Sequence, residues 1–225
     1  MSEQNSKEIR SKITSEGVLE LSIFNGEMPT PGENDVLIKV EGSPINPSDL
    51  GLLISFAADL DTLATSGEGD EVVTTMKIHP GLMGAMKPRL DDSMQVGNEG
   101  GGVVVDAGAN AKHLIGKTVG VAGGAMYSQY RCLPASSCLV MDDGTTAAEA
   151  ASSFVNPLTA LAFVETMKME NHSALLNTAA ASNLGQMLVK ICQDDGVPLI
   201  NVVRKPEQVE TLKKLGAEYI CDTSD

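Results

Sequence analysis

The residues with the clearest chemical pattern lie at positions 178–185 of this 225-residue chain, where the sequence Thr-Ala-Ala-Ala-Ser-Asn-Leu-Gly consists mostly of small side chains. Small side chains let backbone N–H groups approach a phosphate closely, and a helix that begins at such a turn favours negative charge at its amino end. Two cations, Arg204 and Lys205, follow at the end of a later apolar segment. The combination predicts a site that binds phosphate groups.

Ala180, Ser182 and Gly185 stand where the dinucleotide fingerprint has its three glycines, and only the last position keeps glycine. Arg204 follows Gly185 by 19 residues, at the place where dinucleotide-binding proteins distinguish between cofactors. A carboxylate there would accept hydrogen bonds from ribose hydroxyls, whereas an arginine can pair with a 2′-phosphate. Arg204 and Lys205 therefore favour NADP(H). In the alternative interpretation they are an ordinary solvated charge pair.

The elements that must position these residues alternate between strand and helix. Ser182 and Asn183 can cap a helix that Gly196 ends, and Pro206 can begin a second helix that Gly216 ends. Apolar strands are predicted at residues 173–178, 198–203 and 218–221. The order β-α-β-α-β is that of the mononucleotide-binding half of a doubly wound sheet.

Residues 8–168 have a mainly β pattern, with short apolar runs between turn residues and the clearest strand at 36–40. Further strands are predicted at 103–105, 118–121, 127–133 and 138–141. Residues 51–94 show no sustained period, and we interpret them as a long insertion or lid. The alternative is a mobile surface loop without chemistry.

The composition excludes several classes of protein. The 30 acidic and 16 basic residues give a net charge of −14, which disfavours nucleic acid and anionic lipid as partners. No apolar run has the length of a membrane helix, and residues 1–10 do not resemble a secretory signal, so we expect a cytoplasmic protein. The four cysteines form no C-x-x-C pair, which argues against a disulfide framework or a closed zinc site.

Four ordered segments, residues 45–49, 96–104, 154–160 and 201–204, together resemble the medium-chain dehydrogenase/reductase superfamily, and most nearly its quinone oxidoreductases and mitochondrial-type enoyl thioester reductases. The likeness spans nearly the whole chain except the segment 51–94. It implies an α/β plus β fold in which a GroES-like β domain, residues 1–168, packs against a partial Rossmann domain, residues 169–225. NADP(H) and a small electrophilic substrate would meet in the cleft between the domains.

The same resemblance implies roles for individual residues. Asn46 should approach the nicotinamide and Thr159 should line the same pocket. The phosphates of the cofactor should be held by Ser182, Asn183, Leu184, Gly185, Arg204 and Lys205. The enoyl reductases are thought to donate a proton from a tyrosine after the first motif, but residues 50–61 contain no tyrosine. We therefore assign no catalytic residue; Tyr127 and Tyr130 could donate a proton or simply pack.

Zinc alcohol dehydrogenases of the superfamily carry a cysteine and a histidine where this chain has residues such as Pro47 and Asn98. Without a thiolate and an imidazole at those places, a catalytic Zn²⁺ would lack ligands, so we predict no metal. Hydride would then move from NADPH to an acceptor that is already electron-poor, such as a quinone or a conjugated carbonyl. The alternative is an inactive remnant or a GroES-like module that binds a partner.

Members of this family continue beyond the third strand of the nucleotide domain, which leaves one edge of the strand at 174–178 without a partner here. A bare apolar edge favours pairing with another chain. From the sequence we therefore expect a truncated product, a fragment, or a subunit that associates with a further copy through this edge.

Overall fold

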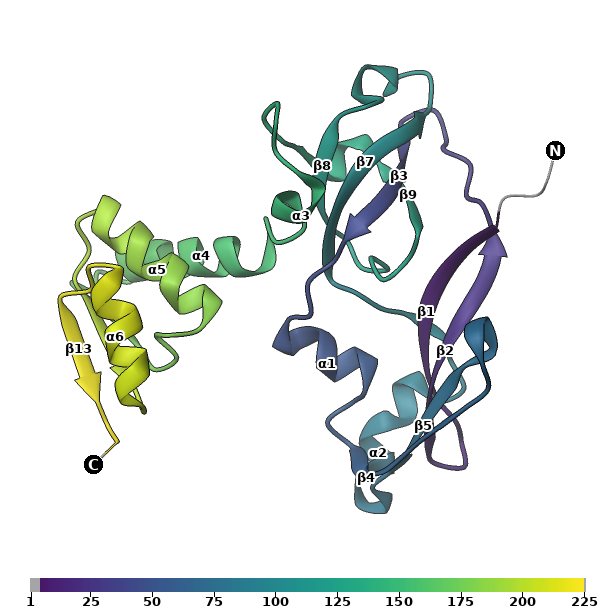
Figure 1. Cartoon of the computed structure of the whole chain (residues 1–225), viewed down its shortest axis with the longest axis horizontal. Helices are drawn as coiled ribbons and strands as arrows, with labels where there is room; N and C mark the ends of the chain where they lie inside the picture. Colours follow the sequence, from purple (N-terminus) through teal and green to yellow (C-terminus); the bar gives the residue numbers. More distant parts are fainter. Residues whose placement is uncertain (1–4, 225) are drawn as a thin grey trace. The chain divides into compact units, whose positions relative to one another are not determined.

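The computed structural model describes residues 5–224. The chain divides between Ser153 and Phe154 into two compact units (Figure 1). The boundary falls before helix α4 (Val155–Met169), whereas the sequence pattern predicts it after residue 168. The reason is packing: Ala160 and Val164 of α4 are buried in the hydrophobic cluster of the second unit.

The first unit contains two five-stranded sheets within the described residues. One sheet has the order β4-β5-β2-β1-β6, and its strands are β1 (Asn5–Ile13), β2 (Val18–Glu27), β4 (Ala58–Ser66), β5 (Val73–Ile78) and β6 (Met94–Gln95). The other has the order β10-β8-β7-β3-β9, with β3 (Asp35–Gly42), β7 (Glu99–Ala107), β8 (Thr118–Ala122), β9 (Tyr130–Pro134) and β10 (Cys138–Val140). All pairings in both sheets are antiparallel.

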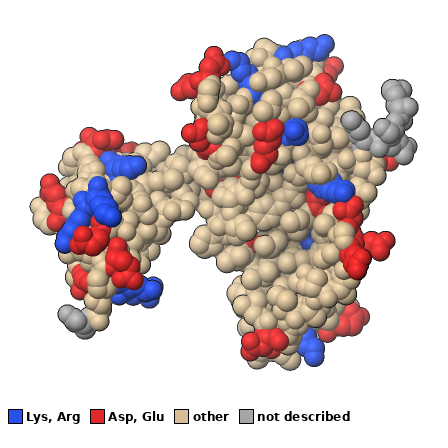
Figure 2. Space-filling view, viewed as in Figure 1, with Lys and Arg blue, Asp and Glu red and all other residues tan. Residues whose placement is uncertain are grey.

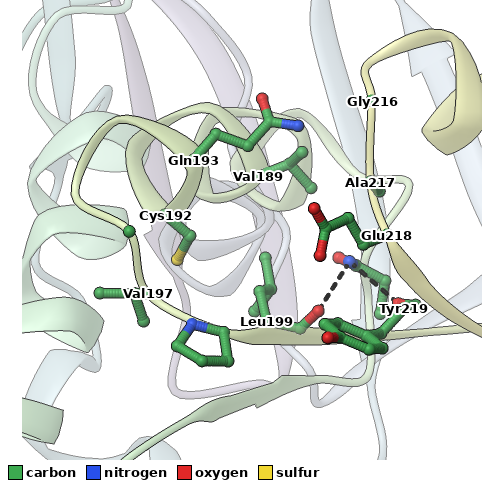
Figure 3. A pocket seen from close by; sticks show the side chains of 12 residues that line it. Val189, Cys192, Gln193, Val197, Leu199, Gly216, Ala217, Glu218 and Tyr219 are labelled. Carbon is green, nitrogen blue, oxygen red and sulfur yellow. Dashed lines mark hydrogen bonds between the residues drawn. The ribbon is translucent and has the colours of Figure 1, made fainter.

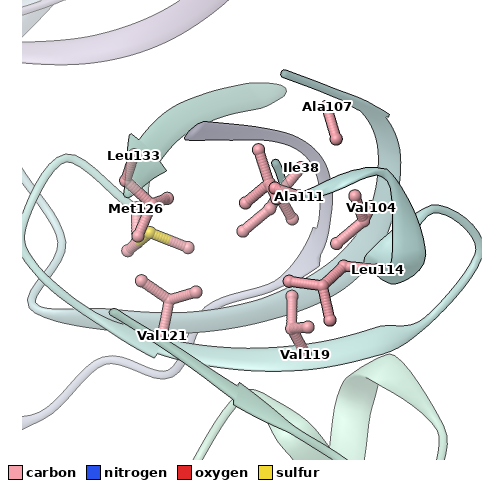
Figure 4. Close-up of a cluster of buried hydrophobic side chains, with 10 residues drawn as sticks. Ile38, Val104, Ala107, Ala111, Leu114, Val119, Val121, Met126 and Leu133 are labelled. Atoms are coloured by element: carbon pink, nitrogen blue, oxygen red, sulfur yellow. The ribbon is translucent and has the colours of Figure 1, made fainter. Parts of the chain in front are cut away.

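The second of these sheets curls around the main core of the unit. Ile38, Val104, Val119 and Val121 alternate with outward-facing residues along their strands and meet Met126 inside the curl (Figure 4). The short helix α3 (Ala147–Ala150) lies against β7 so closely that a Cβ on Gly101 would stand 2.4 Å from a backbone oxygen of α3. Glycine at this position therefore lets the helix contact the sheet.

The segment 51–94, expected to be an insertion or a mobile loop, consists largely of regular structure. Helix α1 (Pro47–Leu53) leads into the hairpin β4-β5, whose second strand pairs with β2, and helix α2 (Met83–Met86) follows. Met76, Ile78 and Met86 are buried in a separate core cluster. The segment is therefore not an irregular loop, because the hairpin extends an existing sheet and buries its own apolar residues. Its interpretation as an insertion stays a prediction.

The second unit confirms the predicted β-α-β-α-β order. Its parallel sheet has the order β11-β12-β13 and consists of β11 (Leu175–Asn177), β12 (Leu199–Val203) and β13 (Tyr219–Asp222). Helices α5 (Asn183–Asp194) and α6 (Pro206–Lys214) connect the strands, as the capping residues predict. Leu188, Val189 and Leu212 from these helices are buried with alternate residues of β12. Within residues 5–224, β11 pairs with β12 only.

The surface agrees with the acidic composition. On the face shown in Figure 2, acidic and basic side chains are interspersed, and the coloured residues form no continuous basic surface. Among residues 5–224, no helix combines the length and apolar character that crossing a bilayer requires.

Candidate functional site

The predicted phosphate loop connects β11 to α5. Ser182 has extended backbone angles and caps α5, and its Oγ accepts a hydrogen bond of 3.1 Å from the backbone N–H of Gly185. A Cβ on Gly185 would stand only 2.3 Å from the carbonyl oxygen of Ala180, so the glycine retained from the fingerprint lets the helix pack against the loop. The 12-residue helix thus begins directly at the small-residue turn.

A cavity of about 280 Å³ lies between this loop and the carboxyl end of β12. Its lining comprises Thr178, Ala179, Ala180, Ala181, Ser182, Val202, Val203, Arg204 and Gln208. The Gln208 side chain accepts a hydrogen bond of 3.0 Å from the backbone N–H of Arg204 and so fixes the end of the strand. The structure therefore brings the loop and Arg204 to one cavity, as the sequence predicts.

The cations beside this cavity are exposed. Within the described part of the chain, neither Arg204 nor Lys205 makes a salt bridge. Lys205 precedes α6 as its N-cap residue and does not line the cavity. Arg204 therefore offers an unpaired guanidinium to an anion in the cavity.

The remaining predicted residues of the second unit lie in other surroundings. Asn183 lines a neighbouring hollow of about 200 Å³ with Gln186 and Lys190, and Leu184 is half-buried. Thr159 lies on α4, where its Oγ1 donates a hydrogen bond of 2.6 Å to the backbone oxygen of Val155. Their roles in binding a cofactor stay predictions.

Asn46, in the first unit, belongs to a buried polar cluster that the sequence analysis did not identify. Its Nδ2 donates to Glu99 at 2.8 Å, and its backbone N–H donates to Asp49 at 2.8 Å. The side chain of Asp49 also accepts a 2.8 Å hydrogen bond from the backbone of Asn98. Asn46, Asp49 and Glu99 are at most 4% exposed, so the cluster is shielded from water. The signal in the sequence is the pattern Asn-x-x-Asp at the start of α1, which is typical of a helix cap.

Tyr127 supports the loop that leads to Asn46. Its hydroxyl donates a hydrogen bond of 3.0 Å to the backbone oxygen of Pro44. Burial, followed by the negative charge of Asp49, raises the pKa of Tyr127 to about 12. The phenol is therefore neutral at ordinary pH, and its hydrogen bond to Pro44 is structural. Tyr130 lies half-buried on β9.

The positions that carry zinc ligands in zinc alcohol dehydrogenases are occupied differently here. Pro47 begins α1, and the Nδ2 of Asn98 donates to the hydroxyl of Ser48 at 2.9 Å. Across residues 5–224, no three His, Cys, Asp or Glu side chains gather closely enough to hold a metal ion. That no metal takes part in the reaction stays a prediction.

The second unit combines a parallel sheet with a small-residue turn at the start of a helix, as in dinucleotide-binding proteins, and a β unit with two sheets precedes it in the chain. No protein-family profile matches the chain. A search of curated proteins finds the mitochondrial enoyl-[acyl-carrier-protein] reductase of Xenopus tropicalis, 27% identical over 210 residues, which cover 89% of this chain and 51% of that protein. Prostaglandin reductase-3 of Mus musculus is 25% identical over 194 residues, covering 85% and 43%.

The comparison with solved structures also finds reductases. A protein from Mesorhizobium loti assigned as an NADPH:quinone reductase is 26% identical, with a TM-score of 0.67 over 98% of this chain and 61% of that one. One from Bacillus thuringiensis with the same assignment is also 26% identical, with a TM-score of 0.69 over 98% and 59%. The chain spans about half the length of the curated relatives it matches.

The homologues of this chain are thus enoyl reductases, a prostaglandin reductase and quinone oxidoreductases, which confirms the resemblance to this branch of the medium-chain dehydrogenase/reductase superfamily. The predicted fold class, a GroES-like β domain with a partial Rossmann domain, is confirmed as well.

Proposed function

We propose that this chain provides the GroES-like unit and the first half of the nucleotide-binding unit of an NADPH-dependent oxidoreductase that transfers hydride to a quinone or a conjugated carbonyl compound. One observation carries the proposal: the unpaired guanidinium of Arg204 lines the same cavity as the phosphate loop. A quinone reductase from Mesorhizobium loti and an enoyl reductase from Xenopus tropicalis, both similar to this chain, support the reaction class.

The residues present fit the cofactor. Small side chains at Ala179–Ser182 leave room for a pyrophosphate, the start of α5 favours its charge, and Arg204 can pair with a 2′-phosphate. When bound, NADPH supplies the hydride. In this proposal the chain itself binds the phosphates, holds Asn46 through Glu99 beside the nicotinamide, and lines the reaction pocket with Thr159. The acceptor is polarised by hydrogen bonds and not by a metal.

The test compares two cofactors on matched variants. NADPH and NADH are titrated against the wild-type chain, Arg204→Ala, and a control, Lys214→Ala, in which the lost cation lies at the far end of α6. A hydrogen bond to a charged group contributes about 1.5–3 kcal/mol, so Arg204→Ala should weaken NADPH binding by about 10-fold or more and leave NADH unchanged. Equal weak binding of both cofactors by all three proteins would refute the assignment.

Steady-state NADPH oxidation with a panel of quinones and enones tests the reaction itself. Saturable turnover that Thr159→Ala abolishes supports an oxidoreductase. NADPH binding without turnover on any acceptor supports the alternative, a GroES-like protein that is inactive or binds a partner. A cytoplasmic location stays a prediction.

We also propose that two copies associate through the outer edge of β11, because that edge is unpaired within residues 5–224 and Leu176 beside it is 61% exposed. Light scattering after gel filtration should give a dimer, and Leu176→Lys should shift it to the monomer. A wild-type monomer at every concentration would exclude this part of the proposal.

A further inference from the structure

Two asparagines lie side by side in the parallel sheet beneath the phosphate loop. Asn177 on β11 and Asn201 on β12 are register partners, so their strands place them about 4.8 Å apart. Asn201 shares the helix-covered face of β12 with Leu199 and Val203, which are buried in the core cluster. Asn177 is 9% exposed and Asn201 is 1% exposed. Two amides are therefore buried next to each other in an otherwise apolar cluster.

Each amide is held at one end by protein groups. The Oδ1 of Asn177 accepts a hydrogen bond of 3.1 Å from the backbone N–H of Ala179, which belongs to the phosphate loop. The Nδ2 of Asn201 donates to the backbone oxygens of Leu199 and Tyr219, both at 3.3 Å; these are the two dashed bonds in Figure 3. The two side chains therefore have fixed orientations.

The other end of each amide has no partner among the described residues. Asn177 Nδ2 is a buried donor, and Asn201 Oδ1 is a buried acceptor. Buried polar atoms without a partner are rare and cost free energy, so this complementary pair calls for an explanation. In the structure no hydrogen bond joins the two amides directly. A water molecule satisfies both atoms, because it can accept from Asn177 and donate to Asn201.

We propose that one buried water molecule bridges Asn177 Nδ2 and Asn201 Oδ1, and that Asn177 is through this bridge a positioning residue for the phosphate loop. Asn201 also lines a cavity of about 300 Å³ at the amino end of the sheet, with Val189, Cys192 and Glu218 (Figure 3). The bridge ties β12 to the backbone N–H of Ala179 and keeps the loop in the conformation that faces the cavity of Arg204. Its effect on NADPH rests on the proposed function.

The test uses two variants of the same shape, Asn201→Thr and Asn201→Val, in the full chain. Both lose the two amide N–H bonds to the backbone oxygens of Leu199 and Tyr219, and only threonine keeps an oxygen that can accept from the water. The threonine variant should unfold at a higher urea concentration than the valine variant and bind NADPH about fivefold more tightly. In an Asn177→Leu background, which removes the donor, the threonine variant should no longer be the more stable one or bind NADPH more tightly, because its buried hydroxyl then lacks the bridge.

A crystal structure of the wild-type chain should show a water within hydrogen-bond distance of both amides. Equal unfolding midpoints for the threonine and valine variants, or a direct bond between the amides, would overturn the proposal. If the wild-type chain binds no NADPH, the proposed function fails, while the unfolding comparison still decides whether the bridge exists.

Discussion

Gly185 offers a direct test of the close packing at the phosphate loop. In Gly185→Ala the new methyl group would stand 2.3 Å from the carbonyl oxygen and 2.6 Å from the carbonyl carbon of Ala180. Both atoms belong to the backbone, so no side-chain rotation can relieve the contact. Forcing an extra methyl into a packed site costs about 1–3 kcal/mol, whereas alanine gains about 1 kcal/mol over glycine inside a helix. We expect a net loss of up to about 2 kcal/mol in the free energy of unfolding.

Gly51 is the matched control, because it also lies in a helix, α1, but a Cβ there would meet nothing within 4 Å. Gly51→Ala should therefore raise the free energy of unfolding by about 0.5–1 kcal/mol. Urea unfolding followed by circular dichroism measures both changes, and each variant should shift the transition of its own compact unit. If both substitutions stabilise the chain equally, helix propensity alone decides and the close approach inferred at Gly185 is wrong.

Three further outcomes follow from the buried groups. Asn46→Leu removes a hydrogen-bond donor from the buried carboxylate of Glu99 and should lower the free energy of unfolding by about 1–3 kcal/mol, measured by urea titration; an unchanged midpoint would contradict the contact. The pKa of Tyr127 is raised to about 12, so its neutral form stabilises the fold below about pH 10, the pKa of an unfolded tyrosine, and that contribution is lost as the pH rises towards 12. Stability of the wild-type chain should therefore fall more steeply than that of Tyr127→Phe over this range. Burial raises the pKa of Cys138 to about 11, so iodoacetamide at pH 8 should label exposed Cys221 first, as peptide mass spectrometry can show; preferential labelling of Cys138 would argue against its burial.

In the second unit, the types of neighbouring residues are enough to predict the order of strands and helices. Ser182, Pro206 and Gly216 act on their own helix ends, and the strands are short apolar runs between them, so the order of elements could be predicted from the sequence. The loop and Arg204 meet at one cavity because parallel strands place their carboxyl ends at the same edge. For most strand ends of this unit, the predicted residue differs from the observed one by one or two positions. The reason is that a strand ends where its pairing with the neighbouring strand ends.

In the first unit, the types of neighbouring residues do not predict which strands pair or which distant side chains meet. Strand β5 pairs with β2, with Lys77 opposite Val18. The sequence of residues 51–94 alone does not indicate that β2 is the partner. The contact between Asn46 and Glu99 joins residues 53 positions apart. Both residues stood in motifs that the sequence analysis singled out, yet their pairing depends on the way β7 and the start of α1 meet.

The sequence by itself determined the alternation of strand and helix, the small-residue turn, and the cation that follows it, because periodicity, capping and side-chain size are properties of neighbouring residues. Only the tertiary structure decided that the segment 51–94 extends a sheet, that Glu99 holds Asn46, and that Asn177 and Asn201 lie side by side. Those contacts join residues far apart in the chain, and their partners are fixed when strands align and bury their polar groups together.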